Sequence, residues 1–342
     1  MLKGNLGIFN LGKKTRETVG LDIGNYSIKV VSILKDTSGR ILTAYNIKNI
    51  PIGTKPGEAG KLVQEALGEV DIRSKEVNLS VSGSSVIVRF ISLPKMSKEQ
   101  LENAMIFEAE KYMPFSVNEV IMDFSILDDA AGGQMNVLLA AAKKDFIQSR
   151  IELLERLGLE ISAIDVNAFA LFNAFSVSNT FSGDKGTVFL DLGYSQTNIL
   201  IVTKGVPRFM RLIQIGGKDI IDMLAEEAGI TADKAEEQKL SDTSAEKVQN
   251  CTTRVMDELV KEIKLSLDYF ENKYNMAVGE IYCSGGLVYQ KGLIEYLQEK
   301  LGNQLMIWDP LKGLDVAENL SRESIAPVAS RLTACIGLAL RD

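Results

Sequence analysis

Two stretches of the chain, VGLDIGNYSIKVVSI (residues 19–33) and VFLDLGYSQTNILIV (residues 188–202), repeat one pattern. Each contains Leu-Asp-apolar-Gly, then a polar turn, then a second apolar segment. This pattern predicts two β-hairpins, each with an acid at the end of its first strand. Because the copies lie far apart in the chain, the repeat indicates a duplicated architecture.

The paired hairpins have the chemistry of a phosphate site. A glycine at the bend lets backbone amides approach a phosphate closely, and consecutive turn amides bind anions. Asp22 and Asp191 would supply oxygen atoms to Mg²⁺. Either acid alone is typical of an ordinary turn, because Asp-x-Gly is common in hairpins. The repeat favours a clamp that holds a triphosphate from both sides.

Composition narrows the classes of function. The chain has 342 residues, 46% of them hydrophobic and 24% charged, which is typical of a soluble protein of about two domains. Its charge of −7 and pI of about 5.1 argue against binding to nucleic acid or to an anionic membrane. The absence of histidine excludes His-based metal sites and Ser-His or Cys-His catalysis. Three scattered cysteines indicate a reducing, cytoplasmic setting.

Further elements surround the hairpins. A small α/β pattern occupies residues 84–160, a strand runs into an apolar helix within 161–182, and residues 216–278 are helical in pattern. CSGGLVYQKG (residues 283–292) follows a strand and precedes a helix. Residues 1–17 are expected to be a flexible leader, since they lack the features of a signal peptide. No apolar run reaches the length of a membrane helix.

This order of elements resembles the actin-like ATPase superfamily. The resemblance implies an α/β, actin-like (ribonuclease H-like) fold of two lobes, with two duplicated mixed-sheet cores and inserted subdomains. Its first core would comprise residues 18–83, 161–182 and 325–342, and its second 183–215 and 279–324. The inserted small α/β subdomain would be 84–160 and the helical subdomain 216–278.

The resemblance also implies a Mg²⁺–ATP site between the lobes, with Asp22 and Asp191 facing the metal. Alternatives stay open for three features: Lys29 as a solvent-facing strand lysine, the Glu236–Lys239 spacing as a solvated ion pair, and Gly285-Gly286 as a plain βα turn. Phosphates would contact Gly24, Asn25, Tyr26, Ser27, Lys29, Gly193, Tyr194, Ser195 and Gln196, and the nucleoside would contact Gly216, Gly217, Glu236, Lys239, Gly285 and Gly286.

One position departs from the hydrolases of this superfamily. They usually carry Glu, Gln or Asp at the start of the first connecting helix, where it orients the attacking water. Here Asn167 occupies that place, with Asp165 two residues before it. Asparagine hydrogen-bonds water but does not accept a proton as a carboxylate does. ATP binding with weak or absent hydrolysis is therefore expected.

Local strings resemble the PilM family of actin-like components of type IV pilus machines: FEAEKYMPFSVNEVIMDF (107–124), DVNAFALFNAF (165–175) and RLIQIGGKDI (211–220). The resemblance implies a cytoplasmic protein, peripheral to the inner membrane through its partner. That partner would be the N-terminal peptide of a PilN-like inner-membrane protein. Other components of the pilus machine are further candidate partners. The peptide groove is expected near Val86, Val88, Phe90, Met113 and Phe115, unless these residues are core.

Two other functions compete with this one. FtsA-like proteins form filaments, but they are longer and end in an amphipathic tail, whereas this chain stops at Asp342 after an apolar helix; we take that to favour PilM. A sugar or acetate kinase of the same superfamily needs a substrate base, and no convincing acid for it is found in the sequence.

Overall fold

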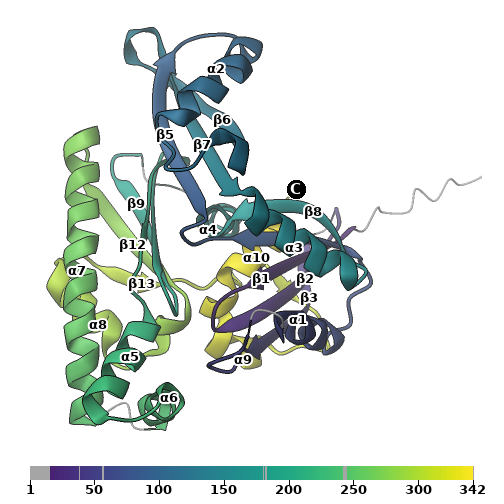
Figure 1. The fold of residues 1–342 in the computed structure, drawn as a ribbon, viewed down its shortest axis with the longest axis vertical. Coiled ribbons are helices and arrows are strands. Elements are labelled where there is room, and N and C mark those ends of the chain that lie inside the picture. Colours follow the sequence, from purple (N-terminus) through teal and green to yellow (C-terminus); the bar gives the residue numbers. More distant parts are fainter. Residues whose placement is uncertain are drawn as a thin grey trace, which may run out of the picture.

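The computed structural model of the chain describes residues 16–37, 39–55, 58–179, 181, 183–241 and 245–341. Most of the expected leader, residues 1–15, lies outside this part, and Arg16 already belongs to the first strand. Two lobes stand side by side, and a smaller unit rises above them (Figure 1). This is the two-lobed arrangement that the resemblance to the actin-like superfamily implies.

The first lobe is built on a six-stranded mixed sheet with the order β14-β3-β2-β1-β4-β8. Its first three strands form an antiparallel meander, and β4 and β8 then continue it in parallel. The strands are β1 (Arg16–Ile23), β2 (Ser27–Lys35), β3 (Arg40–Asn49), β4 (Glu76–Val81), β8 (Glu160–Val166) and β14 (Asp315–Val316). Helices α1 (Ala59–Gly68) and α3 (Lys144–Arg156) cover one face, where Val63 and Leu154 pack against Leu21.

The second lobe repeats that order as β11-β10-β9-β12-β13. Again three strands form an antiparallel meander and two more follow in parallel. The strands are β9 (Gly186–Leu192), β10 (Thr197–Thr203), β11 (Val206–Ile213), β12 (Val278–Ser284) and β13 (Leu305–Ile307). The predicted duplication of a mixed-sheet core is confirmed.

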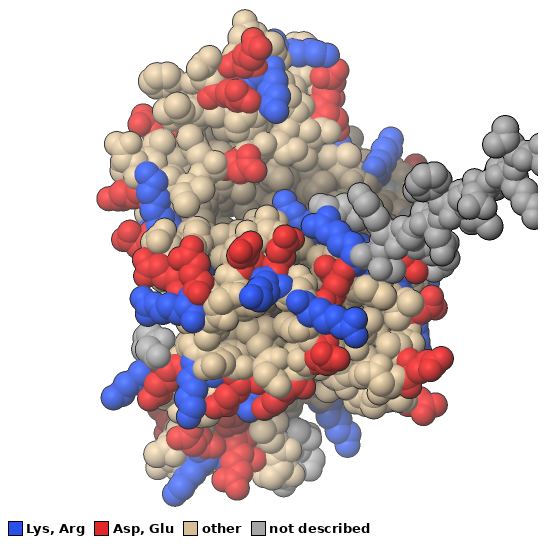
Figure 2. Space-filling view, turned by 90° about the vertical axis from the view of Figure 1, so that its right-hand side faces the viewer, with Lys and Arg blue, Asp and Glu red and all other residues tan. Residues whose placement is uncertain are grey.

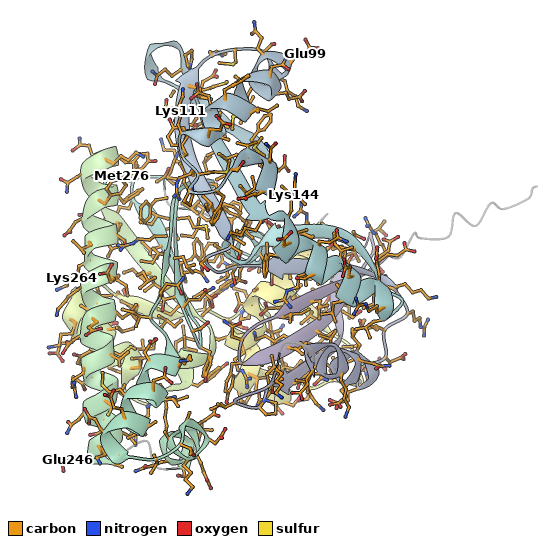
Figure 3. All side chains as sticks on the ribbon, in the orientation of Figure 1. Glu99, Lys111, Lys144, Glu246, Lys264 and Met276 are labelled. Carbon is orange, nitrogen blue, oxygen red and sulfur yellow. The ribbon has the colours of Figure 1, made fainter. Side chains whose placement is uncertain are left out.

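Helices cover the outer face of the second sheet. They are α5 (Gly217–Ala228), α6 (Ala232–Ser241), α7 (Glu246–Tyr274) and α8 (Leu293–Leu301). Apolar residues of α7 recur at intervals of three and four, so that one stripe of the helix is buried on the sheet. Figure 3 shows α7 running from Glu246 past Lys264 along the outside of this lobe.

Two helices lie in the centre of the molecule, between the sheets: α4 (Asn167–Ser176) and α10 (Thr333–Leu340). They touch where Gly337 faces the backbone of Ala170; a Cβ on Gly337 would lie 1.7 Å from the Ala170 carbonyl oxygen. Only glycine permits so close an approach of two helices. The layers are therefore helix, sheet, central helices, sheet, helix.

The stretch Arg322–Leu340 contains α9 (Arg322–Ile325) and α10. Among the described residues it is the one helical stretch that has the length and hydropathy of a membrane span, and 67% of it is buried within the protein. Its apolar character is explained by its central position between the two sheets.

The third unit, which we call the insertion, is a three-stranded antiparallel sheet of order β5-β7-β6 with one helix. Its elements are β5 (Val86–Pro94), α2 (Lys98–Glu110), β6 (Val120–Ala130) and β7 (Gln134–Lys143). Leu101 and Met105 of α2 pack on one face of the sheet. The chain then enters α3 at Lys144 and returns to the first lobe (Figure 3).

Candidate functional site

The two repeated hairpins have the same geometry. The amide of Gly24 donates to the carbonyl of Ser27 at 3.1 Å, and the amide of Gly193 donates to the carbonyl of Gln196 at 3.0 Å. Each acid is the next-to-last residue of the first strand and has a cross-strand partner on the second: Lys29 opposite Asp22, and Asn198 opposite Asp191. The sequence repeat is therefore a structural repeat, with a lysine in one copy where the other has an asparagine.

The tips of the hairpins meet across the cleft between the lobes. The side-chain amide of Asn25 donates to the hydroxyl of Ser195 at 2.7 Å. Beside it the rings of Tyr26 and Tyr194 lie 4.8 Å apart. Behind this contact is a cavity of about 470 Å³ that both hairpins line. Asp22 and Asp191 open onto this one cavity from opposite lobes.

Nearly all the site residues predicted from the sequence line this cavity. They are Asp22, Gly24, Asn25, Tyr26, Ser27, Lys29, Asn167, Asp191, Gly193, Tyr194, Ser195, Gln196, Gly217, Glu236, Lys239, Gly285 and Gly286. Gly216 does not; it lies directly behind the second hairpin, where a Cβ would come within 2.5 Å of the Tyr194 carbonyl oxygen.

Several residues that line the cavity were not predicted from the sequence, among them Ser80, Arg150, Asn198 and Arg331. A signal for Asn198 existed, because it occupies the position in the second repeat that Lys29 occupies in the first. Arg150 and Arg331 lie on helices, outside any repeated string, and nothing in the sequence pattern marks them.

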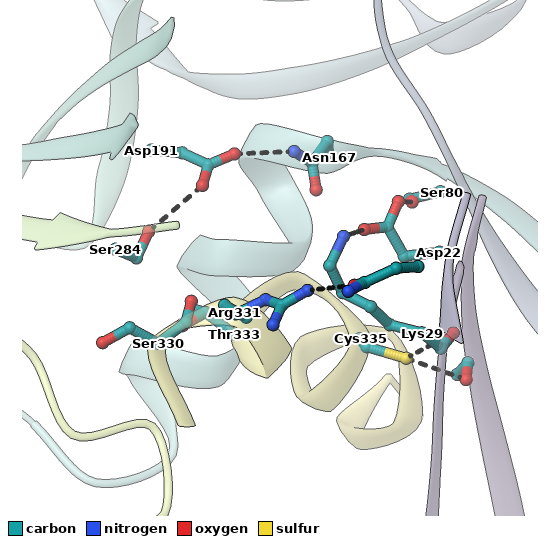
Figure 4. Close-up of polar contacts among 12 residues, drawn as sticks. Asp22, Lys29, Ser80, Asn167, Asp191, Ser284, Ser330, Arg331, Thr333 and Cys335 are labelled. Atoms are coloured by element: carbon teal, nitrogen blue, oxygen red, sulfur yellow. Dashed lines mark hydrogen bonds and ion pairs between the residues drawn. The ribbon is translucent and has the colours of Figure 1, made fainter. Parts of the chain in front are cut away.

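Asp22 is held as a carboxylate by a nearby cation. Lys29 Nζ lies 2.7 Å from Asp22 Oδ2, and the hydroxyl of Ser80 donates to Oδ1 at 2.8 Å (Figure 4). Burial by itself would raise the pKa of Asp22, but the charge and hydrogen bond of Lys29, together with Ser80, lower it below its ordinary value. Lys29 is therefore not a solvent-facing strand lysine, since its side chain is only 15% exposed.

Asp191 lies in a different environment. Its Oδ2 accepts from the side-chain amides of Asn167 at 2.9 Å and Asn198 at 3.3 Å. Burial raises the pKa of Asp191; the charge of Lys29 opposes this shift and that of Asp22 adds to it. Asn167 and Asn198 each keep a buried side-chain oxygen without a partner among the described residues. The hydroxyl of Ser284 also donates to Asp191 Oδ1, at 3.5 Å, so Asp191 is surrounded by neutral donors and has no cation bound to it among the described residues.

Helix α6 contributes Glu236 and Lys239 to the cavity. Lys239 is 9% exposed, and burial lowers its pKa while Glu236 partly offsets the shift. The expectation of a solvated ion pair is thus wrong for Lys239. The Gly285-Gly286 turn lines the same cavity: Gly285 has φ +93°, and a Cβ there would approach the Leu192 carbonyl oxygen to 2.4 Å. This turn therefore packs against the end of β9, the strand that carries Asp191.

The donor set fits a magnesium nucleotide. Mg²⁺ prefers one or two carboxylates with waters and phosphates, and no cluster of three or more acidic, Cys or His ligands occurs among the described residues. Four basic side chains and three acidic ones line the cavity, in a chain whose net charge is −7. An anionic ligand is favoured by this local excess of positive charge, which consists of Lys29, Arg150, Lys239 and Arg331 against Asp22, Asp191 and Glu236.

Comparisons with known proteins identify the fold and the family of the chain. The chain is similar to a chain of the solved PilM–PilN type IV pilus biogenesis complex, with 27% identity and a TM-score of 0.85 over 95% of this chain and 98% of that one. It also shares its fold with the ethanolamine utilization protein EutJ from Carboxydothermus hydrogenoformans, at 16% identity and a TM-score of 0.54 over 95% and 89% of the two chains. The actin-like fold is thereby confirmed. Residues 20–342 match the family of the type IV pilus assembly protein PilM, and the chain belongs to that family.

Proposed function

We propose that this chain binds Mg²⁺–ATP in the cavity between its lobes and serves type IV pilus assembly as a nucleotide-dependent adaptor. The observation that carries the proposal is the repeated hairpin, which brings Asp22 and Asp191 to one cavity from two lobes. A ligand that touches both lobes favours the arrangement in which both contacts are made. ATP would thus act as a clasp between the lobes.

The residues divide by role. Asp22 and Asp191 would hold Mg²⁺ through its waters, and the metal would neutralise phosphate charge. The backbone amides of the two hairpin turns would bind the phosphates. Lys29, now paired with Asp22, lies where it could bind a phosphate oxygen once the metal shares the carboxylate. Glu236 and Lys239 on α6 and the Gly285-Gly286 turn would hold the nucleoside.

Hydrolysis would be slow or absent. Asn167 begins α4, and its side-chain amide donates a hydrogen bond to Asp191. Because an asparagine side chain has no carboxylate, it does not accept a proton from water. Asp165, the nearest acid in sequence, is engaged elsewhere: Arg341 lies 2.7 Å from its Oδ2, and the Val166 amide donates to its Oδ1 at 2.8 Å. Asp165 is also absent from the residues that line the cavity.

The partner would be a PilN-like inner-membrane protein, which contributes a short cytoplasmic N-terminal peptide. The support is the family, together with the likeness to the PilM–PilN complex. The chain would then be cytoplasmic and would reach the inner membrane through that partner.

The insertion offers apolar surface for such a peptide. Figure 2 shows charges of both signs at the top of the molecule and in a band across its middle, with a mostly uncharged surface between them. Phe107 of α2 is 70% exposed, and Ile121 of β6, an edge strand of the three-stranded sheet, is 51% exposed. An extended peptide adds to a sheet edge and fills apolar pockets beside it. Among the residues expected to line the groove, Val88 is buried in the core, and Phe90 and Phe115 are partly exposed.

Two measurements test the proposal. Mg²⁺–ATP should raise the melting temperature, EDTA should cancel the rise, and Asp191→Ala should abolish it. A synthetic N-terminal PilN peptide should bind more tightly with Mg²⁺–ATP present, as measured by fluorescence anisotropy. A melting temperature indifferent to Mg²⁺–ATP would remove the clasp, and turnover of many ATP per second would contradict the role assigned to Asn167.

A further inference from the structure

Arg150 is a cation of the cavity that the proposed clasp does not use. It lies in α3, the helix that follows the insertion, and its side chain reaches the cavity that Asp22 and Asp191 share. Its guanidinium carbon lies 5.4 Å from the centre of the Phe146 ring, one helical turn earlier. This contact directs the side chain along the helix surface toward the cavity.

The guanidinium has no partner of opposite charge. Among the described residues it forms no ion pair and no hydrogen bond. Asp22 is the acid whose charge acts on Arg150, but its carboxylate is already bound by Lys29 and Ser80. Burial lowers the pKa of Arg150, and the charge of Asp22 opposes this shift. A partly buried guanidinium without an anion costs free energy, because desolvation is not offset by a contact. Charged groups perturbed by burial in a cavity cluster at functional sites.

Position along the cavity tells which part of a nucleotide Arg150 would meet. Glu236, Lys239 and Leu240 of α6 line the cavity from the second lobe. Ser82 and Gly83, after β4, and Phe146 and Arg150 of α3 line it from the first lobe. In the ribbon, α6 lies at the lower end of the molecule and α3 higher up, next to the insertion (Figure 1). A nucleotide with its nucleoside at α6 directs its last phosphate toward α3.

We propose that Arg150 binds the terminal phosphate of the nucleotide and makes the cavity prefer a triphosphate to a diphosphate. The inference rests on the proposed nucleotide site and adds its specificity. A guanidinium offers donors in a planar fork that matches two phosphate oxygens, whereas lysine offers a single point charge. No covalent step is involved, because the residue acts on binding alone.

The test is isothermal titration of Mg²⁺–ATP and Mg²⁺–ADP into the full chain and three variants. Arg150→Gln should weaken ATP binding about 10- to 100-fold, the range for a lost hydrogen-bonded charge, and leave ADP binding within about 2-fold. Arg150→Lys should fall between, since it keeps the charge without the fork. Arg156→Gln is the matched control: Arg156 lies on the same helix, 79% exposed and paired with Glu152, so both affinities should stay unchanged.

Thermal melting of the ligand-free protein separates binding from a structural role. Arg150→Gln should melt no lower than the unmodified chain, because it removes a cation that has no partner. Equal losses of ATP and ADP affinity, no loss of either, or a lower melting temperature in the ligand-free Arg150→Gln protein would overturn the inference while leaving the nucleotide site standing. Failure of the unmodified chain to bind either nucleotide would overturn both.

Discussion

Arg208 of β11 donates from both terminal nitrogens of its guanidinium to the carboxylate of Asp128 on β6, one of the bonds measuring 2.9 Å. The amide of Asn136 also donates to Asp128, at 2.7 Å, and Arg208 Nε donates to the hydroxyl of Thr203 at 3.1 Å. Asp128 belongs to the insertion, which the chain joins to the first lobe, and Arg208 belongs to the second. The pair therefore ties the insertion to the lobe opposite its own.

Breaking this pair should loosen the insertion. We expect Arg208→Met to lower the free energy of unfolding by about 1–3 kcal/mol, because the bidentate contact is lost and Asp128 keeps a single amide partner. Hydrogen exchange should quicken in β6. The control is Lys95→Met, which breaks the neighbouring Lys95–Asp129 pair, whose side chains are 61% and 66% exposed, and should change the stability by less than about 0.5 kcal/mol.

The same pair has a pH signature. The hydrogen bonds of Arg208 are the main cause that lowers the pKa of Asp128 below its ordinary value of 3.8. The pair therefore makes its full contribution to the free energy of unfolding at pH values above 3.8, the ordinary pKa of the carboxyl group. This contribution is lost as the pH falls through the lowered pKa of Asp128. Urea titrations should measure the free energy of unfolding of the unmodified chain and of Arg208→Met at neutral and at acidic pH. The two free energies should differ less in acid, and a difference that stays constant with pH would contradict the assignment.

Gly285→Ala should disturb both the fold and the site. The backbone there has φ +93°, and the new Cβ would lie 2.8 Å from Asp191 Oδ1 as well as against Leu192. We expect a loss of about 1–3 kcal/mol in the free energy of unfolding and loss of the melting shift with Mg²⁺–ATP. Gly286→Ala adds a Cβ that meets nothing within 4 Å, so the ligand-free stability of that variant should match that of the unmodified chain. Equal destabilisation by the two substitutions would refute this account.

Lys29→Met should destabilise the ligand-free protein by about 3 kcal/mol, because it leaves the Asp22 carboxylate buried without its cation. Since the lowered pKa of Asp22 depends on Lys29, the variant should lose most stability above the ordinary pKa and less in acid, where Asp22 is protonated. Adding Asp22→Asn to Lys29→Met should restore part of the stability. A double-mutant cycle by urea denaturation measures the coupling, and purely additive effects would show that the ion pair contributes nothing.

Asp191→Asn should have the opposite effect on stability. Burial raises the pKa of Asp191, so the folded protein binds a proton that the unfolded chain releases, and stability falls as pH rises from 3.8 through the raised pKa. Asparagine keeps an oxygen for the Asn167 and Asn198 amides and removes the charge. The variant should therefore unfold at a higher temperature near pH 7 and lose the Mg²⁺-dependent part of the ATP shift. A lower melting temperature without ligand would count against a buried, poorly compensated carboxylate.

The sequence predicted the site best where local chemistry repeats. The Leu-Asp-apolar-Gly strings predicted both hairpins and both acids, because strand alternation and turn chemistry are local properties. Residues that reach the cavity from helices were not predictable, since only tertiary packing brings Arg150 of α3 and Arg331 of the 3-10 helix before α10 (Ala326–Leu332) to it. Directly after Gly285 the chain forms a short 3-10 helix, Gly286–Tyr289, and α8 begins at Leu293, after Gly292 with φ +76°.

The contact between Gly337 and Ala170 has a mechanical consequence. The chain passes from one lobe to the other twice, after α4 and again between β13 and β14, and α4 and α10 are in contact beside these passages. A rotation of the lobes would therefore pivot on that contact, and displacement would grow with distance from it. A few degrees at the pivot would shift little in the neighbouring core, yet it would move the far end of α6 and the outer strands of the insertion by several times as much.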